Sequence, residues 1–184
     1  MKRLAFIVFS LLAFFLPLTC QARLGDSIAR LQQRYGLISG MRGDPKIDGM
    51  AWYLFKEGGY LFEALMIKNT CEILIVSRQN KNELSEAERY IFLEKNLPGF
   101  RWVDMSNPDW IKETKSQMTI FAQACVNFLE KNPGKDVVKY WESSSTKDVA
   151  VYLVDKKTLT FYSKKAQTLE FDPFGEFESS FRRF

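Results

Sequence analysis

The run from Cys71 to Ser77 limits the folds open to this chain more than any other segment. It reads Cys-Glu-Ile-Leu-Ile-Val-Ser, so apolar residues occupy successive positions. Because the side chains of a strand alternate between its two faces, a strand formed here needs a covering layer on both sides. The run therefore predicts a central strand of a buried sheet.

Further strand-like runs lie on either side of this segment. Residues 50–56 and 60–68 flank Glu57-Gly58-Gly59, a pattern typical of a β-hairpin. The Tyr60–Lys68 run is apolar on both faces as well, which again indicates more than one covering layer. The C-terminal half contains runs at 137–142, 148–155 and 158–163, with a short candidate at 169–171.

Helix signals separate these runs. Asp26 or Ser27 can cap a short helix that ends at Gly36, and Ser85 with Glu88 forms a capping box for a helix through Asn96. Residues 37–49 are predicted to be a Gly-rich connection. Residues 117–129 fit both a helical and a strand period, and their Ala, Met, Gln and Leu content favours a helix.

The order of these elements is α-βββ-α(α)-βββ(β). Antiparallel hairpins with segregated helices predict an α+β fold, with residues 23–184 as one domain. At the C-terminus, four phenylalanines recur at spacings of 3, 4 and 3, which is one stripe of an amphipathic helix over 172–184. This candidate interaction stripe comprises Phe174, Phe177, Phe181 and Phe184.

Residues 1–22 have the form of a cleavable signal peptide. Lys2 and Arg3 precede an uncharged apolar run, and Cys20 and Ala22 stand at −3 and −1 from cleavage before Arg23. The alternatives are a lipoprotein acylated at Cys20, or a retained N-terminal anchor. The predicted location is therefore periplasmic or secreted.

The charge of the remaining chain points away from nucleic acid. The protein has 26 basic and 22 acidic residues, and loss of Lys2 and Arg3 leaves 24 against 22, a net charge of +2. Nucleic-acid binding usually needs a clustered basic face. No later run is long enough to predict a transmembrane span.

Cys71 and Cys125 are a candidate disulfide pair, the alternative being two buried thiols.

Catalytic chemistry has little support in the sequence. The protein contains no histidine, which removes Ser-His-Asp and Cys-His systems and the commonest transition-metal ligand. No catalytic residue, metal site or cofactor is predicted. Acidic residues occur at turns or early in a predicted helix, where they have structural roles. Trp102, Trp110 and Trp141 are predicted to fill the core.

Several short motifs resemble small uncharacterised bacterial exported proteins. The opening follows their pattern of Leu-Gly-Asp/Glu-Ser and then Leu-x-x-Arg-Tyr-Gly, here at Leu24–Ser27 and Leu31–Gly36. Tyr53–Gly58 and Leu84–Glu88 match the later aromatic strand and Leu-Ser-x-x-Glu helix, whereas residues 100–136 have no counterpart. The topology is also loosely similar to β-lactamase-inhibitor-like modules. The resemblance implies export and supplies no catalytic residue.

Two hypotheses of function follow. The first is a non-enzymatic binding module whose partner is a protein or a cell-envelope component. The second is a carboxylate-dependent enzyme or small-ligand-binding protein with a cleft near Asp104, Asp109 and Trp110.

Overall fold

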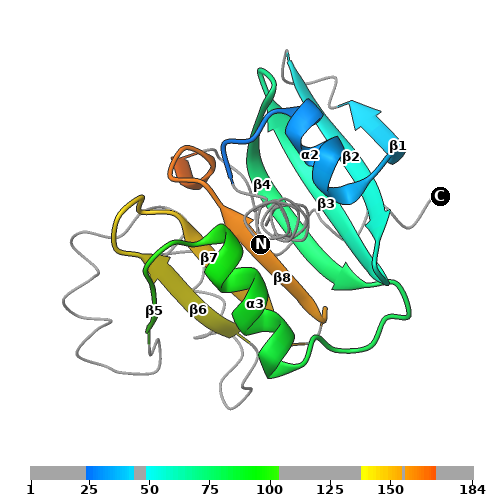
Figure 1. The fold of residues 1–184 in the computed structure, drawn as a ribbon. Helices are drawn as coiled ribbons and strands as arrows, with labels where there is room; N and C mark the ends of the chain where they lie inside the picture. The colour runs from blue at the N-terminus through cyan, green and yellow to red at the C-terminus, as the bar shows by residue number, and fades with distance from the viewer. Residues whose placement is uncertain (1–23, 44–48, 104–137, 155, 169–184) are drawn as a thin grey trace, which may run out of the picture.

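One antiparallel sheet dominates the structure. The computed structural model describes residues 24–43, 49–103, 138–154 and 156–168. Eight strands lie in the order β1-β2-β3-β4-β8-β7-β6-β5, and every neighbouring pair is antiparallel (Figure 1).

The bounds of the elements divide the described chain into two similar halves. The first half comprises α2 (Ile28–Tyr35), β1 (Ile38–Gly43), β2 (Met50–Glu57), β3 (Tyr60–Ile67) and β4 (Thr70–Arg78). The second comprises α3 (Glu86–Asn96), β5 (Phe100–Val103), β6 (Val138–Ser143), β7 (Val149–Leu153), β8 (Thr158–Tyr162) and the short 3-10 helix η1 (Ala166–Thr168). Each half is thus a helix followed by four strands.

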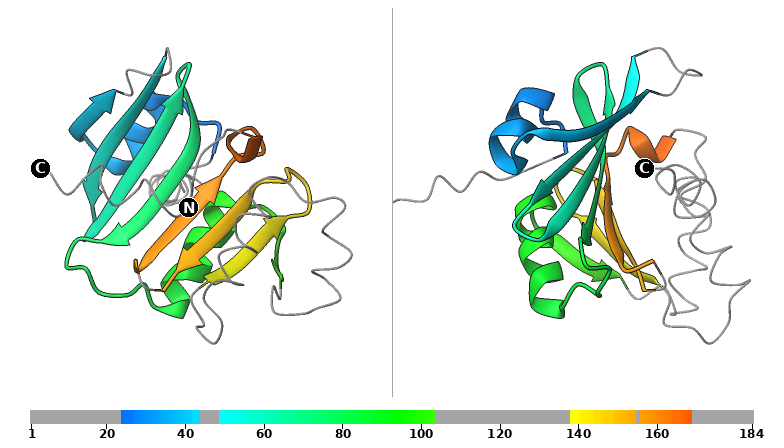
Figure 2. Two further views of the ribbon diagram at one scale, coloured as in Figure 1. Left: turned by 180° about the vertical axis from the view of Figure 1, so that it is seen from behind. Right: turned by 90° about the vertical axis from the view of Figure 1, so that its right-hand side faces the viewer.

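The last strands of the two halves meet at the centre of the sheet. β4 pairs with β8, from Ile73 opposite Tyr162 to Val76 opposite Leu159. The edge-on view shows α2 and α3 on the same face of the sheet (Figure 2). The core beneath them is therefore shared by both halves.

The prediction of an α+β fold is wrong. Within the described residues, a single eight-stranded sheet with two short α-helices is closer to a mainly-β fold. The prediction missed β1, which lies in the expected connection 37–49, and β5, which follows Pro98-Gly99. Both are edge strands in which at least half of the residues are exposed, so neither carries a clear apolar alternation. The predicted C-terminal helix at 172–184 and residues 117–129 lie outside the described part.

Most other local predictions are confirmed. The runs beginning at Met50, Tyr60 and Cys71 are β2, β3 and β4, and the hairpin turns at Gly58 and Gly59, both with positive φ. The predicted helix that ends at Gly36 is α2, and the predicted helix through Asn96 is α3. β4 is central and its residues from Cys71 to Val76 are all buried, as the double-faced apolar run requires.

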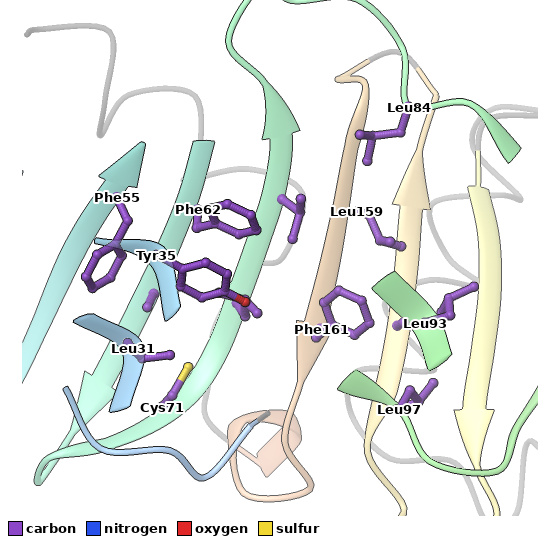
Figure 3. Close-up of a cluster of buried hydrophobic side chains, with 14 of the residues drawn as sticks. Leu31, Tyr35, Phe55, Phe62, Cys71, Leu84, Leu93, Leu97, Leu159 and Phe161 are labelled. Atoms are coloured by element: carbon purple, nitrogen blue, oxygen red, sulfur yellow. The ribbon is translucent and has the colours of Figure 1, made fainter. Parts of the chain in front are cut away.

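The helix-side core joins the two halves. Figure 3 shows Leu31 and Tyr35 of α2 over one part of the sheet and Leu93 of α3 over another. Tyr35 stacks on Phe62 of β3 with ring centroids 3.8 Å apart. The opposite face is buried too: Leu65 and Ile73, which alternate with core residues, are fully buried.

The Asp-Ser and Arg-Tyr-Gly motifs have structural roles in placing α2. Ser27 is the N-cap and accepts from the backbone N–H of Arg30, and Gly36 ends the helix at a φ of 79°. The buried Asp26 carboxylate pairs with Arg34, while its backbone carbonyl accepts from the N–H of Cys71 at 2.9 Å. The motif therefore fixes α2 against the start of β4.

Glu88 places α3 in a similar way. It forms the predicted capping box with Ser85, and its carboxylate also accepts hydrogen bonds from Tyr60 of β3 and from Arg78 of β4 at 2.5 Å. The hydrogen bond from Arg78 is the main cause that lowers the pKa of Glu88 to about 2. One carboxylate thus joins α3 to the first half of the sheet.

Neither described helix could cross a membrane, because none in this part of the chain combines the necessary length with an apolar surface.

We expect Glu88→Gln to lower the free energy of unfolding by about 1.5–3 kcal/mol near neutral pH, because a charge-assisted network is lost. The folded-state pKa of Glu88 lies below its usual value of 4.5, so its stabilising contribution is complete above that pH and is lost as the pH falls toward 2. Urea unfolding at about pH 7 and about pH 2.5 should show the difference between wild type and variant shrinking in acid. The exposed Glu83→Gln is the control, and an unchanged difference in acid would contradict the assignment.

We expect Phe161→Ala to cost about 3–5 kcal/mol of unfolding free energy. Phe161 is fully buried on β8, where it lies opposite Leu74 of β4 and Ala150 of β7. Leu37→Ala, at a residue that is 84% exposed, should change it by less than about 0.5 kcal/mol. Equal urea midpoints for the two variants would refute the shared core.

Candidate functional site

Large apolar side chains are exposed at the two ends of the sheet. Leu37 and Met41 lie at the β1 end, and Tyr90, Ile91 and Trp102 lie on α3 and β5 at the other end. Isolated exposed apolar residues are ordinary on a protein surface. The group at the β5 end is different because three aromatic residues gather there, two of whose rings are in contact.

Three rings form what we call the aromatic edge: Tyr90, Phe100 and Trp102. Phe100 and Trp102 are two residues apart on β5 and so point to the same face of the sheet. The Phe100 ring meets the Tyr90 ring edge-on, with centroids 5.5 Å apart. Trp102 remains 62% exposed and Tyr90 56% exposed, so both of these side chains stay in contact with water.

β6, the strand paired with β5, places a second tryptophan beside the aromatic edge. Trp102 lies opposite Trp141 of β6, whose side chain is only 8% exposed. On the other face of the same pair of strands, Arg101 makes an ion pair with Glu142 at 3.1 Å. The exposed tryptophan therefore lies beside a buried one on a strand with a fixed register.

The turn before β5 holds the strand at its position. The buried Ser143 hydroxyl donates to the carbonyl of Pro98 at 2.7 Å, and the Ser144 hydroxyl donates to the carbonyl of Gly99 at 3.2 Å. Gly99 has a φ of 61°, and a Cβ there would approach the Ser144 Oγ to 3.0 Å. The Pro98-Gly99 pair, expected only to stop the helix, also positions the edge strand.

β5 is the last strand of the described sheet. An edge strand presents backbone N–H and C=O groups on its outer side, which can pair with an added strand. Exposed tryptophan and tyrosine are the side chains that most often carry binding energy at protein interfaces. The aromatic edge therefore combines the two features that suit docking of an extended segment.

The structure tests only some of the predicted site residues. Trp141 is in the core, but the core interpretation of Trp102 is wrong. The sequence could not predict the exposure of Trp102, because the residues of a short strand do not show whether that strand lies at the edge or in the middle of a sheet. The phenylalanines of the candidate stripe lie outside the described residues, as do Asp104, Asp109, Trp110 and Cys125.

Cys71 lies in the helix-side core. It is a free thiol in the structure, and its Sγ lies 3.4 Å from the carbonyl oxygen of Ile73. Burial raises the pKa of this thiol to about 12, which suppresses the reactive thiolate. Since Cys125 is not described, the disulfide between them remains a prediction.

No cluster of three or more Cys, Asp or Glu side chains in the described ranges is arranged to hold a metal ion.

No protein-family model matches the chain, and no curated protein matches it significantly. A cysteine-rich secretory protein from Staphylococcus aureus is similar in structure, with a TM-score of 0.36 and 12% sequence identity. The match covers 77% of this chain and 45% of that protein, so the chain spans less than half of its length. A likeness this distant says nothing of function.

Proposed function

We propose that this chain is an exported, non-enzymatic binding module, and that the aromatic edge is where it docks an extended segment of a partner protein. The observation that carries the proposal is Trp102, which is 62% exposed on an edge strand. The signal-like residues 1–22 and the resemblance to bacterial exported proteins support export.

The arrangement of β5 favours a protein segment over a small molecule. A strand added beside β5 would form main-chain hydrogen bonds along the edge, and its side chains on the helix face would contact Trp102 and Phe100. Tyr90 would extend this contact from α3. A small ligand would gain little here because the three rings form an open surface, whereas small ligands are bound in concave sites.

The interaction is testable by photocrosslinking in the native cell envelope. Full-length protein would carry p-benzoylphenylalanine in place of Trp102 or, as a matched exposed control, in place of Leu37. We expect a discrete crosslinked species from position 102 and none of that size from position 37. Identical crosslinking profiles from the two positions would refute docking at the aromatic edge.

The side chains can be tested with the captured partner. Trp102→Ala and Tyr90→Ala should each weaken its binding by about tenfold or more, because truncated interface aromatics commonly cost that much. Since both residues are exposed, the free energy of unfolding of the variants, measured in urea, should stay within about 0.5 kcal/mol of the wild-type value. Unchanged affinity in both variants would contradict the proposal.

A further inference from the structure

A pocket of about 410 Å³ lies at the opposite end of the sheet from the aromatic edge. Its walls come from β1, β2 and β3 and from the chain after β4, and include Met41, Leu54, Lys56, Leu61, Glu63 and Gln79. The β2 and β3 residues alternate with Phe55 and Phe62 of the helix-side core, so they face away from α2. The volume suits a ligand the size of an amino acid.

Glu63 is the unusual residue of this pocket. It lies on β3 between Leu61 and Leu65 of the same face, with Leu54 of β2 and Ile75 of β4 directly opposite. Among the described residues its carboxylate has no hydrogen bond or ion pair. Burial alone raises the pKa of Glu63 to about 7. The Glu63 carboxylate therefore lacks the oppositely charged group or hydrogen-bond donor that usually accompanies a half-buried charge.

Lys56 provides the opposite charge. It lies on β2 opposite Leu61, one diagonal step from Glu63 on the same face. Lys56 is exposed, and no ion pair joins it to Glu63. The pocket therefore has one acidic and one basic group at neighbouring positions, beside an apolar wall formed by Leu54 and Leu61.

The neighbouring strands β1 and β4 add no further charged group to the lining of the pocket. From β4 the residues facing Glu63 are Ile75 and Ser77, and the chain beyond it contributes the neutral Gln79, whose amide donates to the carbonyl of Tyr60. On β1, Arg42 lies opposite Trp52 and already has an interaction partner. Within the described pocket, Lys56 and Glu63 are the charged lining residues.

We propose that this pocket binds a free α-amino acid with an apolar side chain, its ammonium group at Glu63, its carboxylate at Lys56 and its side chain on the leucine wall. A zwitterion meets both charges at once, whereas a simple amine would be repelled by Lys56 and a simple acid by Glu63. A peptide separates its two terminal charges, whereas Lys56 and Glu63 occupy diagonal neighbouring positions on adjacent strands, which favours the free amino acid. This site goes beyond the docking function proposed for the aromatic edge.

The probe for the test is L-leucine, added to the full chain and followed by NMR. We expect the backbone resonances of residues 54, 56, 61 and 63 to shift. Isoamylamine, which is leucine without its carboxylate, and 4-methylpentanoate, which is leucine without its amine, should each bind at least about tenfold more weakly. The dipeptide Leu-Leu should also bind more weakly than leucine.

Substitutions of Glu63 and Lys56 test whether these two side chains bind the charged groups of leucine. Glu63→Gln and Lys56→Met should each weaken leucine binding by about tenfold or more, while Glu57→Gln and Lys68→Met, which alter exposed residues outside the pocket, should not change it. Binding to the wild type should strengthen as the pH rises through about 7, where Glu63 ionises, and Glu63→Gln should abolish this dependence. A Glu63→Gln variant should fold, because it replaces a half-buried acid with a neutral isostere.

Three results would overturn the proposal. They are the absence of any leucine-induced shift at the pocket, equal affinity for leucine and isoamylamine, and tighter binding of Leu-Leu than of leucine. None of them depends on the aromatic edge, so the two proposals can fail separately.

Discussion

The pairing of β4 with β8 is the constraint on which the rest of this structure depends. Four residue pairs, from Ile73 with Tyr162 to Val76 with Leu159, join two units that are each a helix followed by four strands. Without this pairing each unit would have an additional open edge and a smaller core. With it, the most apolar strand of the chain lies in the middle of the sheet, where both of its faces can be buried.

The helices are attached to this sheet by polar contacts as well as by packing. Asp26 ties the start of α2 to β4, and Glu88 ties the start of α3 to β3 and β4. Each helix is short, so its own hydrogen bonds would not keep it folded in water. Capping and ion pairing at the first turn fix where each helix begins, and the buried aromatic and leucine side chains then hold it on the sheet.

The proposed binding features lie at the two ends of the sheet, where β1 and β5 leave side chains and backbone groups exposed. At the β5 end the surface is aromatic and open, which suits a protein segment. At the β1 end a pocket has one acid and one base beside an apolar wall, which suits a small zwitterion. The centre of the sheet is buried on both faces, so its side chains stabilise the fold and are not accessible to a ligand or partner.

The sequence by itself determined the elements whose signals are local. Capping residues define where α2 and α3 begin, the Gly58-Gly59 turn defines a hairpin, and the apolar run from Cys71 defines a central strand. Only the tertiary structure decided that β1 and β5 are strands, because an edge strand needs no apolar alternation and takes its conformation from its neighbour. The same holds for the sites: Trp102 is exposed and Glu63 is half-buried because of which strands lie beside them, and no short window of sequence contains that information.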